Sequence, residues 1–161
     1  RYGFYYENRL REALQAFKFG GRKDVGRQLV WALKDRLADF EDRIDCIVPL
    51  PVTERRLWQR GFNQSYIIAE EIGKMTGKPV HPGILRKTRQ TQDQFKLSRE
   101  ERKKNVRNAF SVKNGRDLAG SRVLLVDDLF TTGYTAKEAA RALRRLRPRS
   151  VFLFALARTP P

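Results

Sequence analysis

Two adjacent carboxylates end an apolar run in the stretch "RVLLVDDLFTTGYTAKEAARAL", residues 122–143. Asp127 and Asp128 follow four apolar residues whose pattern is typical of a buried strand. Unpaired carboxylates are costly to bury, so this placement indicates that both side chains have a binding partner. The vicinal diol of a ribose is a good match, because each carboxylate accepts a hydrogen bond from one hydroxyl. Divalent cations held through water are the other natural partner.

A short polar run follows the two acids, and it consists of Thr131, Thr132, Gly133, Tyr134 and Thr135. Hydroxyls donate to phosphate oxygens, and a glycine permits the backbone conformation that turns N–H groups toward an anion. The helix that we expect next favours negative charge at its N-terminus. The stretch therefore describes a receptor for a sugar 5-phosphate, and it matches neither a Walker A nor a dinucleotide pattern. A helix N-cap is the simpler alternative, although a cap needs only one residue.

The elements that must position these residues alternate between helices and strands. We expect two helices within residues 7–40, then a strand over 43–51, a helix over 63–77 and a strand beginning near 84. Strands over 109–112 and 122–128, a helix over 135–146 and a strand over 150–158 follow. This order predicts an α/β fold with a mostly parallel central sheet flanked by helices on both faces. We expect one domain over residues 1–161, with a helical part (1–42) and a ligand-binding core (43–161).

The composition limits the function classes that are open. The 161 residues carry 34 Lys and Arg against 18 Asp and Glu, a formal net charge of +16, which favours polyanionic partners or a solvated basic surface. Cys46 is the only cysteine and His81 the only histidine, so an intramolecular disulfide, a cysteine zinc cluster and a histidine metal site are excluded. Apolar runs stay well short of the ~20 residues that span a bilayer.

The acidic and polar run "VLLVDDLFTTGYT" resembles the phosphoribosyl-pyrophosphate (PRPP) signature of type I phosphoribosyltransferases. The stretches "FKFGGRKD", "IVPLPVTERRLWQRGFNQS" and "RKTRQTQDQFKLSREERKKNVRNAF" are similar to the ComF family, a branch of that superfamily. The resemblance runs from Tyr6 to Arg158 and implies a type I phosphoribosyltransferase fold. Many members of the family carry a four-cysteine zinc ribbon before this domain. The present sequence has none, so either the ribbon was lost or the chain begins after it.

The resemblance also implies roles for individual residues. Asp127 and Asp128 would be catalytic and would hold the ribose hydroxyls, while Thr131, Thr132, Gly133, Tyr134 and Thr135 would hold the 5-phosphate. Pro51, Val52 and Thr53 would approach the leaving diphosphate with backbone amides, and Arg60 could pair with it as a fork donor. A structural role for the residues around Arg60 is equally open. Mg²⁺ would be bound through PRPP and water, with no direct protein ligand.

Residues 86–107 form a strongly basic excursion, and relatives place a mobile flap there over the active site. Cations with interspersed aromatic and amide side chains suit single-stranded nucleic acid, although a solvated loop explains the charge as well. The candidate nucleic-acid-binding residues are Arg86, Lys87, Arg89, Lys96, Arg99, Arg102, Lys103 and Lys104.

Three functions follow from the resemblance. The first is a glycosyltransferase that uses PRPP, or a related sugar phosphate, with Mg²⁺ and passes phosphoribosyl to an unknown acceptor. The second is a factor in DNA uptake and natural transformation that contacts single-stranded DNA and other competence proteins. The third is a PRPP sensor without turnover. The expected location is the cytoplasm, with binding to the inner face of the cell membrane where partner proteins provide it.

Overall fold

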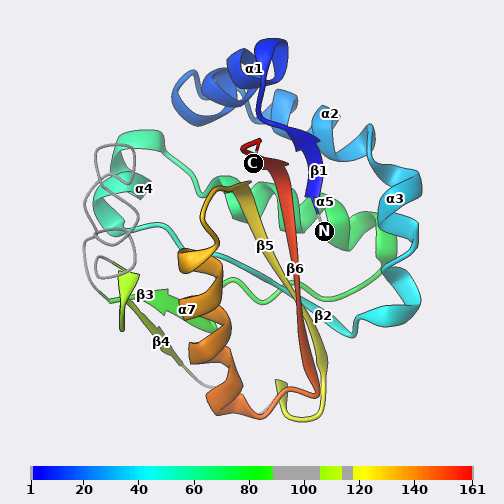
Figure 1. Cartoon of the computed structure of the whole chain (residues 1–161), viewed down its shortest axis with the longest axis vertical. Coiled ribbons are helices and arrows are strands. Elements are labelled where there is room, and N and C mark those ends of the chain that lie inside the picture. The colour runs from blue at the N-terminus through cyan, green and yellow to red at the C-terminus, as the bar shows by residue number, and fades with distance from the viewer. Residues whose placement is uncertain (1, 89–105, 114–117, 161) are drawn as a thin grey trace.

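A parallel sheet of four strands forms the centre of the molecule (Figure 1). The computed structural model describes residues 2–88, 106–113 and 118–160. The strand order is β1 (Tyr2–Tyr5), β6 (Ser150–Arg158), β5 (Arg122–Phe130) and β2 (Cys46–Pro49), and every neighbouring pair is parallel. Val80 extends the β2 edge through a single parallel bridge to Ile47. Parallel strands bring their carboxyl ends to one edge of the sheet, which is the usual place for ligands in such folds.

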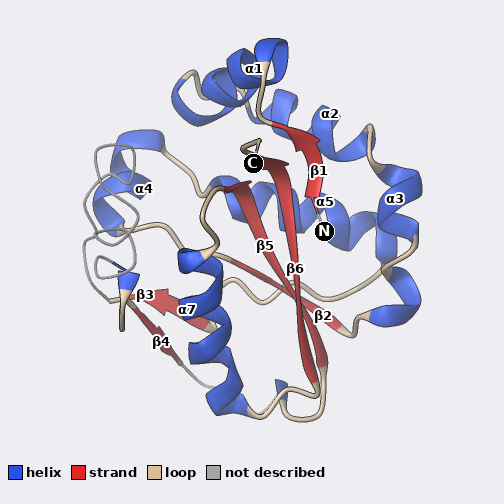
Figure 2. Cartoon of the chain, viewed as in Figure 1, coloured by secondary structure: helices blue, strands red, loops and turns tan. Residues whose placement is uncertain are grey.

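Helices cover both faces of the sheet (Figure 2). One face packs against α1 (Asn8–Phe19), α2 (Lys23–Trp31), α3 (Lys34–Ala38) and α5 (Gln64–Thr76). The other face packs against α7 (Tyr134–Leu143) and a separate antiparallel pair, β3 (Leu85–Lys87) with β4 (Phe110–Val112). A short helix, α4 (Glu54–Arg60), follows β2, and 3₁₀ turns lie at Glu41–Arg43 and Arg144–Leu146.

The apolar run that precedes the two acids is buried on both sides. Leu124 and Val126 of β5 face the core formed with α1 to α3 and α5, whereas Val123 and Leu125 face the core formed with α7. A central strand with helices on both faces needs apolar residues at every position, because neither face meets water. The run therefore anchors the start of the acidic stretch rigidly in the sheet.

The predicted α/β fold is confirmed, and four details differ from the expectation. The N-terminal part contributes β1 to the sheet, and the second expected helix breaks at Leu33 into α2 and α3. The helix α4 was not foreseen. The strand β5 continues two residues further than expected, to Phe130, so the two acids lie inside the strand rather than at its end. The capping-box spacing of Ser98 and Glu101 also predicts a short helix, which falls outside the described residues.

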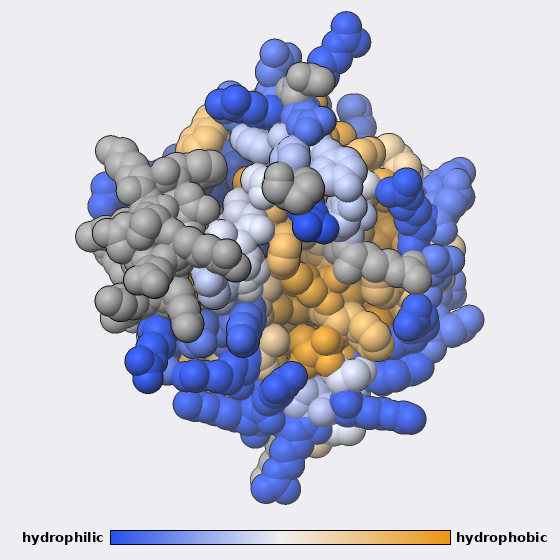
Figure 3. Space-filling view, in the orientation of Figure 1, coloured by the Kyte–Doolittle hydropathy of each residue, from blue (hydrophilic) through white to orange (hydrophobic). Residues whose placement is uncertain are grey.

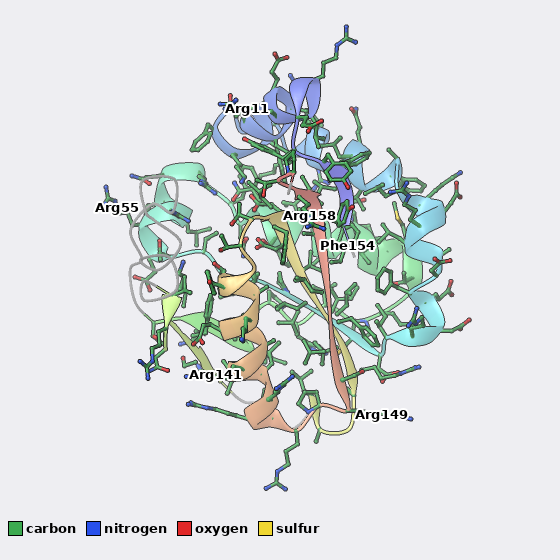
Figure 4. The ribbon with its side chains drawn as sticks, in the orientation of Figure 1. Arg11, Arg55, Arg141, Arg149, Phe154 and Arg158 are labelled. Atoms are coloured by element: carbon green, nitrogen blue, oxygen red, sulfur yellow. The ribbon has the colours of Figure 1, made fainter. Side chains whose placement is uncertain are left out.

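The surface is strongly hydrophilic at its rim. Arg55, Arg141 and Arg149 project away from the ribbon, while Phe154 points into the interior (Figure 4). Apolar residues gather in the middle of the face seen in Figure 3, where the strands of the sheet run. Among the described residues, none of the helices is long and apolar enough to cross a membrane.

Candidate functional site

A pocket of about 580 Å³ opens where β2 and β5 end. Its walls come from the end of α1, the loop after β2, α4, the start of α5, β3, the end of β5 and the turn into α7. The polar and glycine residues on these walls are Lys18, Arg56, Gln59, Arg60, Gln64, Ser65, Lys87, Asp127, Asp128, Thr131, Gly133 and Thr135. The pocket thus gathers both predicted acids, part of the predicted phosphate loop and four cations.

The two acids have different partners. Asp127 Oδ1 accepts from the Ser65 hydroxyl at 3.3 Å and from the Asp128 backbone N–H at 2.8 Å. Asp128 Oδ2 lies 2.8 Å from Lys18 Nζ, and these two side chains are only 14% and 13% exposed. Lys18 therefore reaches Asp128 from a helix far away in the sequence.

These environments shift the pKa values of the two acids in opposite directions. Burial and the negative charge of Asp128 raise the pKa of Asp127 to about 7. Burial alone would raise the pKa of Asp128 as well, but the charge and hydrogen bond of Lys18, with the charge of Arg60, lower it overall. At neutral pH Asp128 is therefore ionised, whereas Asp127 lies near its pKa and readily takes up or releases a proton.

The turn after β5 presents three of the five predicted phosphate-loop residues to the pocket. Thr131, Gly133 and Thr135 line it, while Thr132 of the turn and Tyr134, the first residue of α7, do not. Gly133 has a φ of 75°, and a Cβ there would lie 2.8 Å from Phe130 Cζ. Only glycine fits this turn without strain, and the ten-residue helix α7 begins directly after it with its N-terminus at the pocket.

The three residues predicted to approach the diphosphate lie in the loop after β2 and have different places in the structure. Pro51 and Val52 line the pocket. Thr53 is buried and caps α4, because its hydroxyl accepts from the Arg56 N–H at 3.4 Å. Gly61 ends α4 in the left-handed conformation. A capping threonine before the helix and a glycine after it were the sequence signals that could have revealed α4.

Arg60 and Gln64 form a linked pair on the pocket wall. Arg60 donates to Gln64 Oε1 at 3.0 Å, and its guanidinium carbon lies 5.0 Å from the centre of the Phe19 ring. Since Arg60 can only donate, the amide oxygen of Gln64 must face it, which leaves Nε2 as the donor on the other side. Gln64 is 1% exposed, and its Nε2 has no hydrogen-bond partner among the residues that the structure describes. Buried donors without partners are rare in proteins, so Gln64 is a candidate to donate to a ligand in the pocket.

Comparison with known proteins agrees with this geometry. Residues 60–160 match the phosphoribosyl transferase domain family. The chain belongs to that family. It is 30% identical over 151 residues to competence protein F of Haemophilus influenzae, covering 90% of this chain and 66% of that protein. It is 36% identical over 115 residues to the DNA utilization protein YhgH of Escherichia coli, covering 71% and 50%.

The resemblance to the ComF branch of type I phosphoribosyltransferases is therefore confirmed. The chain spans about half to two thirds of the length of these two relatives. A solved purine phosphoribosyltransferase from Pyrococcus horikoshii shares the fold, with a TM-score of 0.54 and 16% identity over 84% of this chain and 74% of that one.

The pocket also contains Lys87, which the sequence placed with the nucleic-acid-binding candidates. Lys87 lines the pocket from β3, where burial and the charge of Arg56 lower its pKa to about 8. Its neighbour Arg86 is exposed, and its part in nucleic-acid binding stays a prediction. The other candidates lie outside the described residues: Arg89, Lys96, Arg99, Arg102, Lys103 and Lys104.

Sequence reasoning missed Lys18, Arg56 and Gln64 as pocket residues. Their neighbours gave only weak signals: "FKFGG" ends a helix, and "RGFNQS" joins two helices. Which side chain of a helix end enters a pocket depends on tertiary packing, which the sequence pattern alone does not give.

Cys46 of β2 lies in the core on the side of the sheet that packs against α7. The Cys46 thiol is buried, and burial raises its pKa to about 11, as for an inert core thiol. Within residues 2–88, 106–113 and 118–160, no group of three or more His, Cys, Asp or Glu side chains could hold a metal ion.

Proposed function

We propose that the chain binds PRPP with Mg²⁺ and transfers its phosphoribosyl group to an acceptor. The observation that carries the proposal is the meeting of the two acids, a hydroxyl and glycine turn, a helix N-terminus and four cations in one pocket. This set suits a ligand with a diol at its centre and phosphates at both ends.

Each part of the pocket has a task in this proposal. Asp127 and Asp128 accept hydrogen bonds from the ribose hydroxyls, and the turn at Thr131, Gly133 and Thr135 holds the 5-phosphate. The bond from ribose C1 to the diphosphate breaks and a bond to the acceptor forms, while the acceptor loses a proton. Arg56, Arg60 and Lys87 stabilise the charge on the departing diphosphate. Mg²⁺ would reach the pocket on the diphosphate and neutralise part of that charge.

The biological setting that we propose is the handling of DNA in the cytoplasm. The relatives named competence protein F and DNA utilization protein support it, as does the formal net charge of +16. Trp58, which is 88% exposed on α4, gives a flat surface on which a base of single-stranded DNA can stack.

A titration of Mg·PRPP into the wild type and into an Asp127→Asn, Asp128→Asn double variant tests the proposal. We expect binding by the wild type and its loss in the variant. A well-folded wild type that releases no heat and shows no shift in melting temperature with Mg·PRPP would refute a PRPP site. Binding without release of diphosphate, over a panel of acceptors, would favour a sensor over an enzyme.

A further inference from the structure

A lysine from the N-terminal helix enters the proposed sugar site. The Lys18 ammonium lies 2.8 Å from Asp128 Oδ2, and both side chains are about six-sevenths buried, at 13% and 14% exposure. Lys18 also lines the pocket itself. Removing two charges from water is costly, so a sequestered ion pair is weak evidence of a purely stabilising role. Its position points instead to the ligand.

We propose that Lys18 is a positioning residue for the sugar-phosphate ligand: it holds the Asp128 carboxylate for a ribose hydroxyl and brings the end of α1 onto the occupied site. This inference rests on the proposed function, since both concern the same pocket. A carboxylate has two oxygens with about four lone-pair sites. Asp128 can therefore accept from Lys18 and from a hydroxyl at the same time.

The charges around Asp128 make Lys18 the decisive partner. Asp127 stands beside it on β5, Lys18 faces it from α1 and Arg60 from α4. Arg56 of α4 and Lys87 of β3 line the same pocket and are its other charged groups within the part of the chain that the structure describes. Without Lys18, two neighbouring carboxylates would share the remaining cations, and the pair would take up a proton more readily.

The residue after Lys18 brings α1 to the mouth of the pocket. Phe19 is the last residue of α1, is 73% exposed and lines the pocket, with the Arg60 guanidinium over its ring. Lys18 thus links the end of α1 to Asp128, and the next side chain, Phe19, already contacts Arg60 in the same pocket. Ligand binding at Asp128 and the placement of α1 are then linked through one ion pair.

Titrations of Mg·PRPP at about pH 6 and about pH 8.5 test this role. The variants are Lys18→Met, Lys18→Gln and Lys18→Arg, and the matched control is Lys34→Met, which removes the same charge from the exposed surface of α3. We expect the two neutral variants to bind about tenfold more weakly or worse, since a hydrogen bond to a charged group is lost. The loss should be larger at pH 6, because Asp128 without Lys18 is protonated more easily and then no longer serves as a carboxylate acceptor. Lys18→Arg should recover most of the affinity, and Lys34→Met should match the wild type.

The outcomes separate this inference from the proposed function. A wild type that binds while Lys18→Met and Lys18→Gln bind equally well overturns the role of Lys18 alone. Equal weakening at both pH values reduces Lys18 to a source of positive charge and also overturns the positioning role. Failure of both neutral variants to fold, judged by circular dichroism, assigns Lys18 to stability instead. A wild type that does not bind overturns the proposed function and this inference together.

Discussion

At the scale of single residues, the acidic pair makes stability depend on pH. The folded-state pKa of Asp127, about 7, lies above its unfolded value of about 4, so the folded protein binds this proton more tightly. Its contribution is therefore most favourable below about pH 4 and is lost as the pH rises to 7. Replacement by Asn removes the ionisation. We expect Asp127→Asn to raise the free energy of unfolding at about pH 8.5 by about 2 to 4 kcal/mol.

Urea denaturation of the two proteins at about pH 5 and about pH 8.5 checks this difference. The gain from Asp127→Asn should shrink at the lower pH, where the wild-type carboxyl is already largely protonated. Titrating groups that do not interact with Asp127 cancel in the comparison because both proteins carry them. A gain that is equal at the two pH values, or a loss at pH 8.5, would contradict the assignment.

The Gln64 amide nitrogen, which has no hydrogen-bond partner among the described residues, predicts opposite effects on stability and binding. A buried donor without a partner costs about 1 to 3 kcal/mol, and methionine has a similar length without the donor. Gln64→Met also loses the acceptor for Arg60, so we expect a net gain in unfolding free energy of about 1 kcal/mol or less. Affinity for Mg·PRPP should fall. Gln28→Met, at an exposed position of α2, is the control and should leave affinity unchanged. A Gln64→Met variant with lower stability and normal affinity would assign the amide to the fold.

At the scale of elements, α4 depends on its cap. Thr53→Ala removes the hydroxyl that accepts from the Arg56 N–H and should cost about 1 kcal/mol in thermal or urea unfolding. Thr53→Ser keeps the hydroxyl and should restore stability. If Thr53→Ala changes PRPP affinity but leaves stability intact, Thr53 acts on the ligand and its capping bond is unimportant.

The turn between β5 and α7 depends on its glycine. Gly133→Ala places a Cβ at a left-handed φ of 75° and against the Phe130 ring, so we expect a loss of about 1 to 3 kcal/mol together with a loss of ligand affinity. Gly83→Ala is the matched control, because a Cβ at Gly83 meets open space without a left-handed backbone. Equal effects of the two substitutions in melting and titration experiments would remove the special role of this turn.

Much of this element plan could be predicted from the sequence, for reasons that differ between elements. The strand before Asp127 carries apolar residues at every position, which is a strong signal for a central parallel strand. The acids and the turn at Gly133 follow a long and specific pattern. In contrast, β1 has only four residues and acquires its strand geometry by pairing with β6. Long-range pairing of this kind leaves no local pattern.

The site residues that lie in one stretch of sequence could be predicted, whereas those that come from distant elements could not. Asp127 to Thr135 form one stretch, so their convergence could be expected from the sequence. Lys18 and Lys87 come from distant elements, and a single lysine in a basic sequence carries no distinguishing signal. The pocket contacts of both residues arise only from the packing of α1 and β3 around the end of β5.

At the scale of the whole molecule, the excess of positive charge predicts salt-dependent binding to nucleic acid. We expect binding to an oligothymidine to weaken steeply between low and moderate salt, with log affinity falling linearly against log salt concentration. Fluorescence anisotropy over a salt series measures the slope, and a neutral polymer of similar size serves as the control ligand. An affinity that is flat across the series, or no binding at low salt, would contradict a role in handling DNA.

The pairing of β1 with β6 has a consequence for how the chain acquires its shape during synthesis. Tyr2 of β1 aligns with Ala155 of β6, so β1 must wait for β6, which is made much later, before it can join the sheet. Contacts between such distant positions form slowly, because a long loop of chain must close first. The helix α1, directly after β1, carries Lys18. On the ribosome, β1 can therefore join the sheet only after β6 has emerged, which makes this edge of the sheet, beside the helix that carries Lys18, one of the last described parts of the molecule to form.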